Sequence, residues 1–180
     1  MRTSLIVDIN RFRHNVRSIR EQLAPGTLFL AVVKADGYGH GATTLALVAE
    51  EEKVDYFGVA TVDEAVELRE AGISTPILML TEPTDVEQLQ AVLYYNISLT
   101  IYTPSFLSNL SDVAAKFGKP VPVHLKVDTG MSRVGVRPDD ALLMAKTITD
   151  DACLQLEGVL THLADADGDD ESYSLLQMKR

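Results

Sequence analysis

Short apolar runs alternate with longer amphipathic segments along the chain, and this alternation limits the possible folds more than any other feature of the sequence. The runs contain few polar residues, which is typical of parallel strands that are buried on both faces. We expect six strands, at residues 28–33, 56–60, 77–80, 97–101, 121–127 and 154–161. The amphipathic segments predict helices at residues 42–52, 62–71, 84–95, 104–117, 138–149 and 170–180.

Residues that commonly begin and end helices agree with this division. They stand at both ends of a first helix and at several later boundaries: Asp8 and Pro25-Gly26 around a helix that runs through Leu23, Thr61 with Glu64 and Thr84 with Glu87 as capping boxes, and Gly72 and Gly118 as C-caps. One helix is therefore followed by six strand–helix units. Their spacing of about 20 to 30 residues fits either a (β/α) barrel or an open doubly wound sheet.

Composition and charge exclude several classes of partner. The 180 residues include 26 acidic and 16 basic side chains, a net charge of −10, which argues against nucleic acid or an anionic membrane surface as the main partner. Cys153 is the only cysteine, so no internal disulfide can form. The apolar run at the N-terminus is too short for a signal peptide, and no run approaches the ~20 residues of a membrane helix. We expect a cytoplasmic α/β domain over residues 1–180.

Lys34 follows the first predicted strand directly, and three glycines come soon after it. Active sites of barrels and doubly wound sheets form at this end of a strand. Partial burial there favours the neutral amine, which can attack a carbonyl and form a Schiff base. Tyr38 adds a phenol four residues later. The alternative is that Lys34 extends from the strand end into solvent and the glycines only build a turn.

A second group of ionisable residues lies on the fifth predicted strand. Strand alternation places His124, Lys126 and Asp128 on one face, and such residues are costly to bury unless they are paired. A solvated edge strand is the alternative, which the apolar residues between them disfavour. Arg133 follows after a glycine-containing turn and suits an anionic oxygen, although a surface salt bridge would also explain it.

The end of the sixth predicted strand carries a further candidate and an acidic cluster. His162 could act as an acid, a base or a positioning group, although a lone histidine is more often a structural hydrogen-bond partner. Five acidic residues fall between positions 165 and 171, but their spacing does not match an EF-hand, so we interpret them as a solvated loop before a helix. We find no metal-ligand spacing, no dinucleotide fingerprint and no Walker A sequence.

Three segments resemble the signature sequences of alanine racemases, in the order that this family has them. Ala31–Gly41 (AVVKADGYGHG), here the Lys34 motif, resembles the family's pyridoxal phosphate (PLP) attachment sequence. His124–Gly135 (HLKVDTGMSRVG), here the Arg133 motif, and Thr161–Asp167 (THLADAD), here the His162 motif, resemble its second and third signatures. The third departs mildly, because the family more often has Phe at the position of Leu163.

The resemblance implies a homodimeric, PLP-dependent racemase of alanine that supplies D-alanine for peptidoglycan. Lys34 would be the Schiff-base lysine and the base that takes the α-proton of D-alanine. Tyr38 would approach the cofactor phosphate, and His162 would pack against the pyridine ring. Arg133 would contact the cofactor's phenolic oxygen and the substrate, and Lys126 would be carbamylated and orient it. The family's opposite base is a tyrosine of the partner's C-terminal domain, for which we find no candidate.

Length and the resemblance together predict an incomplete domain. A (β/α)₈ barrel takes about 250 residues, whereas 180 residues supply about six strand–helix units. We therefore expect a truncated barrel without its last two units and without the C-terminal β-domain, which alone is at best weakly folded and inactive. A racemase of another amino acid such as serine, or a non-catalytic PLP carrier of the same barrel type, stay open as alternatives.

Overall fold

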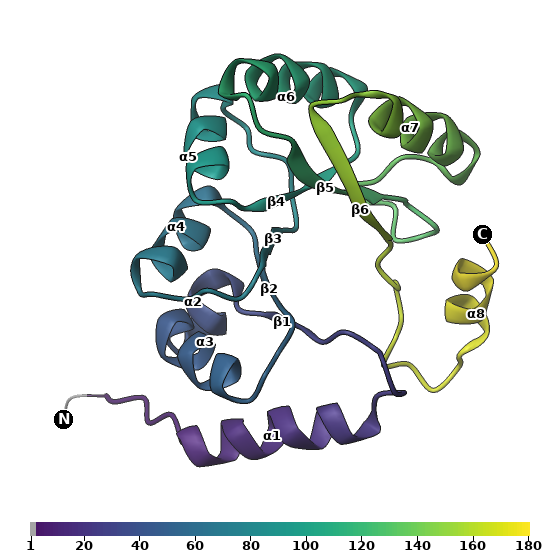
Figure 1. Cartoon of the computed structure of the whole chain (residues 1–180). Coiled ribbons are helices and arrows are strands. Elements are labelled where there is room, and N and C mark those ends of the chain that lie inside the picture. The colour runs from purple at the N-terminus through teal and green to yellow at the C-terminus, as the bar shows by residue number, and fades with distance from the viewer. Residues whose placement is uncertain (1–2) are drawn as a thin grey trace. The chain divides into compact units, whose positions relative to one another are not determined.

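A computed structural model gives the fold of residues 3–180 (Figure 1). The chain forms two compact units, of which the first ends at Leu80 and the second begins at Thr81. Each unit contains three parallel strands, and in each the helices follow the strands in alternation.

The first unit is a small parallel sheet covered by helices. Its elements are α1 (Ile9–Gln22), β1 (Leu30–Val32), α2 (Lys34–Gly39), α3 (Ala42–Glu51), β2 (Tyr56–Val59), α4 (Val62–Glu70) and β3 (Ile77–Met79). Strand β2 pairs with β1 on one side and β3 on the other, with Phe57 opposite both Ala31 and Ile77. Phe57, Ile77 and Leu68 of α4 are almost completely buried, so the core lies between the sheet and its helices.

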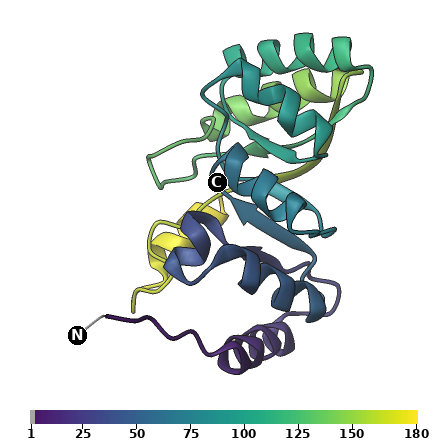
Figure 2. The same ribbon diagram turned by 90° about the vertical axis from the view of Figure 1, so that its left-hand side faces the viewer.

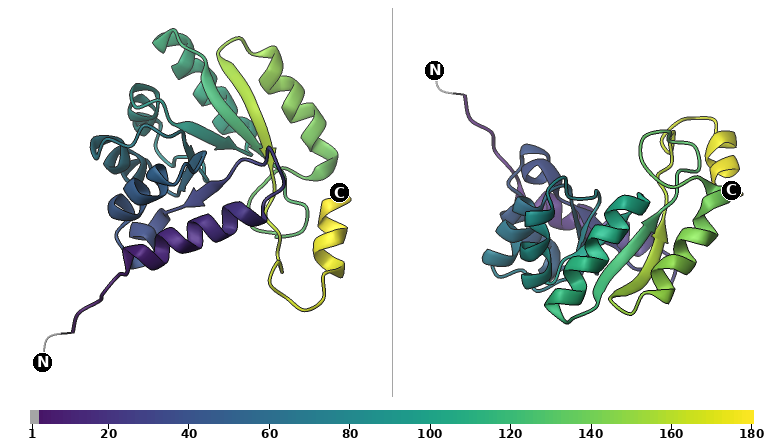
Figure 3. Two further views of the ribbon diagram at one scale, coloured as in Figure 1. Left: turned by 60° about the horizontal axis from the view of Figure 1, so that its bottom comes forward. Right: turned by 90° about the horizontal axis from the view of Figure 1, so that it is seen from above.

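The second unit repeats this pattern with longer strands. Its elements are the 3₁₀-helix η1 (Val86–Gln88), α5 (Leu89–Tyr94), β4 (Ser98–Ile101), α6 (Pro104–Phe117), β5 (Val121–Lys126), α7 (Pro138–Asp150), β6 (Leu154–Leu160) and α8 (Ser172–Met178). Strand β5 is central and pairs in parallel with β4 and β6. Figure 3 shows β5 and β6 side by side with α7 along them, and α8 beyond the carboxyl end of β6.

The predicted elements are confirmed, with ends that shift by at most two residues. All six strands form, and each predicted helix contains an observed helix. Asp8 caps α1 through the backbone N–H groups of Asn10 and Arg11. Thr61 and Glu64 form the predicted capping box of α4. Gly118 ends α6 at a φ of +74°, a conformation that glycine adopts without strain.

The capping box predicted at Thr84 and Glu87 is wrong. Asp85 is the cap instead, and its carboxylate accepts the backbone N–H of Glu87 at 2.9 Å. The segment begins as the 3₁₀-helix η1 and becomes the α-helix α5 only at Leu89. Asp and Thr are both good N-caps, and the sequence pattern placed the boundary one residue too early.

Ion pairs fasten α1 to α3 in the first unit, where the two helices lie against each other (Figure 2). Arg17 Nε and Arg13 Nη1 each contact the Glu52 carboxylate at 2.5 Å, and Arg13 also reaches Glu51 at 2.6 Å. Hydrogen bonds from Arg17 and then Arg13 lower the pKa of Glu52 to about 2.

We predict that these ion pairs make stability depend on pH in the acid range. Because the pKa of Glu52 is lower in the folded state, its contribution is complete above about pH 4.5 and is lost as the pH falls towards 2. The Glu52→Gln variant should therefore lose less stability than wild type between these pH values, measured by urea denaturation. An equal loss in both proteins would contradict the prediction.

We also predict that the two threonines of the expected capping boxes differ in their contribution to stability. Thr61→Ala should lower the free energy of unfolding by about 1 kcal/mol, because the first turn of α4 loses an acceptor. Thr84→Ala is the matched control, and it should change stability by less than about 0.5 kcal/mol because Thr84 is exposed and caps nothing. Equal effects in urea denaturation would contradict this assignment of the caps.

Candidate functional site

Lys34 lies just beyond β1 and begins α2, which is a left-handed turn. Ala35, Asp36, Gly37 and Tyr38 have φ values from 52° to 59° and ψ values from 39° to 52°. The sequence predicts a turn made flexible by glycine here, but three of these four residues are not glycine. Each such residue costs about 1–2 kcal/mol in the left-handed region, so the surrounding structure has to impose this conformation.

Hydrogen bonds from two helices hold the left-handed turn in place. Glu64 Oε1 in α4 accepts the backbone N–H of Ala35 at 2.8 Å, while its Oε2 accepts that of Ala60 at 2.7 Å. At the other end, Asp36 Oδ1 accepts the N–H of Ala42, the first residue of α3, at 2.8 Å. The sequence predicted only the capping role of Glu64, because nothing in the Lys34 motif points to a partner 29 residues away.

The side chains of Lys34 and Tyr38 are available to a ligand. Lys34 is half-buried, and Tyr38 is 60% exposed. Neither side chain has a hydrogen-bond or ion-pair partner within residues 3–180. The left-handed turn therefore fixes the backbone of Lys34 and Tyr38, while their side chains stay uncommitted, that is, without a partner within residues 3–180.

In the second unit, β5 carries the predicted ionisable face. Lys126 is only 6% exposed, and β5 lies between two other strands, so the alternative of a solvated edge strand is wrong. His124 is half-buried; its Nε2 lies 3.7 Å from Glu157 Oε2, which also accepts the hydroxyl of Ser98 at 3.2 Å. Burial lowers the pKa of His124, and the charge of Glu157 opposes this effect.

Asp128 organises the turn of the Arg133 motif. Its Oδ1 accepts the backbone N–H of Ser132 at 2.9 Å and that of Gly130 at 3.0 Å. These backbone hydrogen bonds, with that of Ser132 the strongest, lower the pKa of Asp128, and the charge of Lys126 adds to the effect. The turn ends in Arg133, which is exposed and has no partner among residues 3–180.

His162 lies two residues after β6, in a loop that is joined to the Arg133 motif. The hydroxyls of Thr129 and Thr161 are 2.7 Å apart. Gln177 of α8 donates to the backbone carbonyl of His162 at 3.0 Å and to Thr129 Oγ1 at 3.1 Å. The structure thus brings the Arg133 and His162 motifs together in the second unit, whereas Lys34 and Tyr38 belong to the first. The sequence did not identify Gln177, and a single amide in the apolar run Leu175–Met178 was the only indication.

The acidic residues of positions 165–171 form an exposed loop that leads into α8, as predicted. Asp170 Oδ1 accepts the backbone N–H of Ser172 at 2.9 Å, and this bond lowers the pKa of Asp170. Within residues 3–180, no group of three or more histidine, cysteine or acidic side chains could hold a metal ion.

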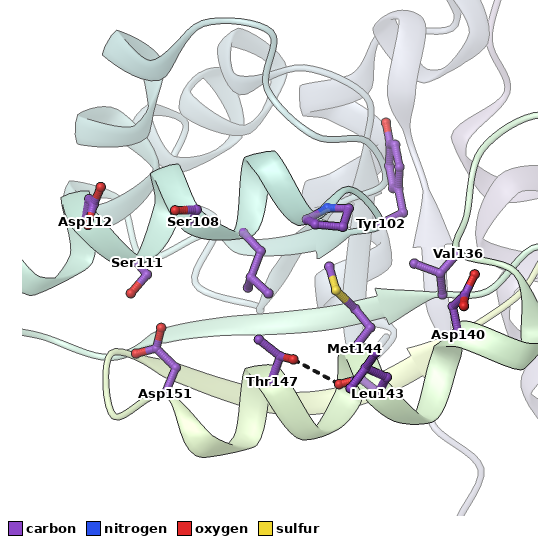
Figure 4. Close-up of a pocket in the computed structure, with 12 residues that line it drawn as sticks. Tyr102, Ser108, Ser111, Asp112, Val136, Asp140, Leu143, Met144, Thr147 and Asp151 are labelled. Carbon is purple, nitrogen blue, oxygen red and sulfur yellow. Dashed lines mark hydrogen bonds between the residues drawn. The ribbon is translucent and has the colours of Figure 1, made fainter.

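A cavity of about 660 Å³ opens between α6 and α7, away from the predicted residues (Figure 4). Met144 and Leu107 contribute its apolar lining, and Asp112, Asp140 and Asp151 supply carboxylates. None of the predicted site residues lines this cavity, so it has no part in the candidate site.

Each of these side chains, within its own unit, has a chemistry that suits one part of a cofactor that carries an aldehyde and anionic oxygens, as PLP does. The amine of Lys34 suits the aldehyde, and the phenol of Tyr38 and the guanidinium of Arg133 are donors for anionic oxygens. Because all three lack partners within the described part of the chain, none has to break an internal bond to receive such a ligand.

Comparison with known sequences is consistent with this chemistry. The family model described as "Alanine racemase, N-terminal domain" matches residues 7–180. An alanine racemase of Desulfovibrio desulfuricans is 44% identical over 174 residues, which cover 97% of this chain and 47% of that protein. The chain therefore spans about half the length of the curated relatives that it matches.

Solved structures confirm the predicted fold class. An alanine racemase of Clostridium difficile matches 94% of this chain and 44% of its own with a TM-score of 0.90 and 34% identity. A histidine racemase of Leuconostoc mesenteroides matches 95% of this chain and 46% of its own with a TM-score of 0.87 and 28% identity. The α/β fold, with six parallel strands among the described residues, is that of the alanine racemase N-terminal domain. Among the described helices, none has the length and apolar character to cross a membrane.

We predict that Glu64 keeps the backbone beside Lys34 ordered. Glu64→Gln replaces one carboxylate oxygen by an NH₂ group, which cannot accept both the Ala35 and the Ala60 N–H. Hydrogen exchange of residues 34–38 should become faster by about tenfold, the effect of losing one hydrogen bond that holds the turn. Glu21→Gln in α1, at an exposed residue, is the control. Unchanged exchange in Glu64→Gln would show that the turn does not depend on this carboxylate.

Proposed function

Because the chain belongs to the family of alanine racemase N-terminal domains, we propose that it forms the cofactor-binding barrel segment of a PLP-dependent racemase that interconverts L- and D-alanine. The observation that carries this proposal is the uncommitted amine of Lys34, held at the carboxyl end of β1 by a backbone turn that is fixed from both sides. The resemblance of the three motifs to the family's signatures supports the same reading.

Lys34 has two tasks in the proposed reaction. Its amine would hold the cofactor covalently, and Nζ, when free, would accept the α-proton of D-alanine. PLP, when bound, makes that α-proton acidic by withdrawing electrons from the α-carbon. Racemisation also requires a second acid–base group on the opposite face of the substrate. We assign no residue of this chain to that group.

The other predicted residues would hold the cofactor and orient the substrate. We assign Tyr38 to the cofactor phosphate, Arg133 to the cofactor's phenolic oxygen and to the substrate, and His162 to the pyridine ring. Each choice follows the chemistry of the side chain, because a phenol donates, a guanidinium pairs with anionic oxygen and an imidazole presents a flat face.

Lys126 is the candidate for carbamylation. As a cation it attracts Asp128, whose pKa it helps to lower. Carbamylation would replace this attraction by a repulsion, so the modified side chain would need the guanidinium of Arg133 as its partner. Intact-protein mass spectrometry tests this assignment: it should detect the added mass of one CO₂ and lose it in Lys126→Ala.

The parent protein would act as a cytoplasmic homodimer and supply D-alanine for peptidoglycan. These properties follow from the family resemblance, and the net charge of −10 supports a small-molecule substrate rather than a nucleic acid.

A racemase of another amino acid is the second candidate, because the chain also matches a histidine racemase with a TM-score of 0.87. Incubation of the full-length protein with alanine, serine and histidine in heavy water separates the possibilities. We expect loss of the α-hydrogen signal fastest for alanine. If another amino acid exchanges its α-hydrogen fastest, that amino acid and not alanine is the substrate. PLP binding without any exchange would favour a carrier protein.

We predict that borohydride traps the cofactor on Lys34. The full-length protein should show a visible absorption band that reduction removes, with the cofactor then found on the peptide that contains Lys34. Lys34→Ala should abolish the band and racemisation in both directions, because both the point of attachment and the base are lost. Lys146→Ala, an exposed lysine of α7, is the control. Trapping at another lysine would overturn the assignment.

A further inference from the structure

Gln177 is a buried amide whose hydrogen bonds join both motif loops of the second unit. Its residue is only 1% exposed. Nε2 donates to Thr129 Oγ1 at 3.1 Å and to the backbone carbonyl of His162 at 3.0 Å, and Oε1 accepts the backbone N–H of Ala164 at 2.8 Å. Both donors and the acceptor of the amide thus bond to residues of the Arg133 and His162 motifs.

Two further side chains, one on α8 and one just after it, contact the Arg133 motif. The hydroxyl of Tyr173 donates to the carbonyl of Gly130 at 2.9 Å, and Arg180 Nη1 donates to the carbonyl of Thr129 at 2.8 Å. Tyr173 lies four residues before Gln177 on α8, the spacing that brings side chains to one helix face, and Arg180 lies two residues after the end of the helix. Gly130 has a φ of +152°, and a Cβ there would lie 2.6 Å from the Tyr173 oxygen. The fit of α8 against this turn therefore depends on the absence of a side chain at Gly130.

The contacts of Gln177 require an amide and fix its orientation. If the amide were turned over, Nε2 would face the N–H of Ala164, which is also a donor. A carboxylate would place oxygen against the carbonyl of His162, and an apolar side chain would remove the side-chain bonds to the His162 carbonyl and the Ala164 N–H and leave Thr129 with only its bond to Thr161. Because a buried donor or acceptor without a partner is costly, simple filling of the core does not explain glutamine here.

We propose that Gln177 is a positioning residue of the cofactor site. Its hydrogen bonds join the loop of His162 to the loop of Arg133. On this view α8 sets the places of the imidazole and the guanidinium before any ligand binds. The inference rests on the proposed function, because these two side chains are assigned there to the cofactor and the substrate. Gln177 touches neither and acts through the backbone and through Thr129.

The test compares Gln177→Glu with wild type in the full-length protein. Glutamate has the same shape and keeps an acceptor for Ala164, but it cannot donate to the carbonyl of His162. In the cofactor-free protein we expect hydrogen exchange to rise in residues 128–133 and 161–164 and to stay unchanged elsewhere. Titration with PLP should show an affinity about tenfold or more below that of wild type, the effect of one lost hydrogen bond to a fixed partner. With saturating PLP, the visible band should shift and kcat should fall more than KM rises.

Gln90→Glu is the matched control, because it makes the same chemical change on α5 at an exposed residue without a side-chain partner. It should leave exchange, PLP affinity and the band within twofold of wild type. Gln177→Met and Thr129→Val together form a double-mutant cycle. We expect their effects on PLP affinity to be less than additive, because both remove the same bond.

Two results would overturn the proposal. The first is exchange in Gln177→Glu that stays at the wild-type rate in both loops. The second is exchange that rises evenly over the whole protein with an unchanged band at saturating PLP, which would mean a purely structural role. A wild-type protein that binds no PLP would instead overturn the proposed function, and the exchange experiment would still decide whether Gln177 joins the two loops.

Discussion

Parallel pairing of the strands is the constraint on which the rest of this structure depends; β2, β3 and β4 are largely buried on both faces, whereas β1 and β6 are partly exposed. Backbone N–H and C=O groups inside the sheet need partners, and here each strand finds them on a parallel neighbour, which requires the chain to return through a helix between strands. All carboxyl ends in a unit then meet at one edge. In the second unit this brings the residues after β5 and β6 close enough for the hydroxyls of Thr129 and Thr161 to bond.

Much of the fold could be predicted because each strand is both short and apolar. In residues 121–127 burial alternates as predicted from Val121 to Leu125, whereas Lys126 is buried like its apolar neighbours. The helix caps were predicted where a single residue satisfies the local backbone, as Asp8 and Thr61 do. The boundary at Thr84 was missed because Asp85 beside it is an equally good cap.

The parts of the candidate site that could not be predicted depend on partners far away in the sequence. Nothing local gives Ala35 a positive φ; that conformation is held by Glu64, which the pattern explained fully as a capping residue. Gln177 gave no clear indication for the same reason, since its partners are Thr129 and the loop of His162. Periodicity indicates which face of an element is buried, but it does not indicate which polar atom, distant in the sequence, will contact that face.

The left-handed turn after Lys34 has a mechanical consequence. Its backbone is tied to α4 at Ala35 and to α3 at Asp36, so the main chain offers the amine no hinge. Any movement of the amine must come from rotation about the side-chain bonds of Lys34, around a pivot that stays in place. In the proposed function the amine of Lys34 would both hold the cofactor and exchange a proton with the substrate, so it would change its position in every cycle. A fixed pivot returns the amine to the same starting point each time, whichever enantiomer entered.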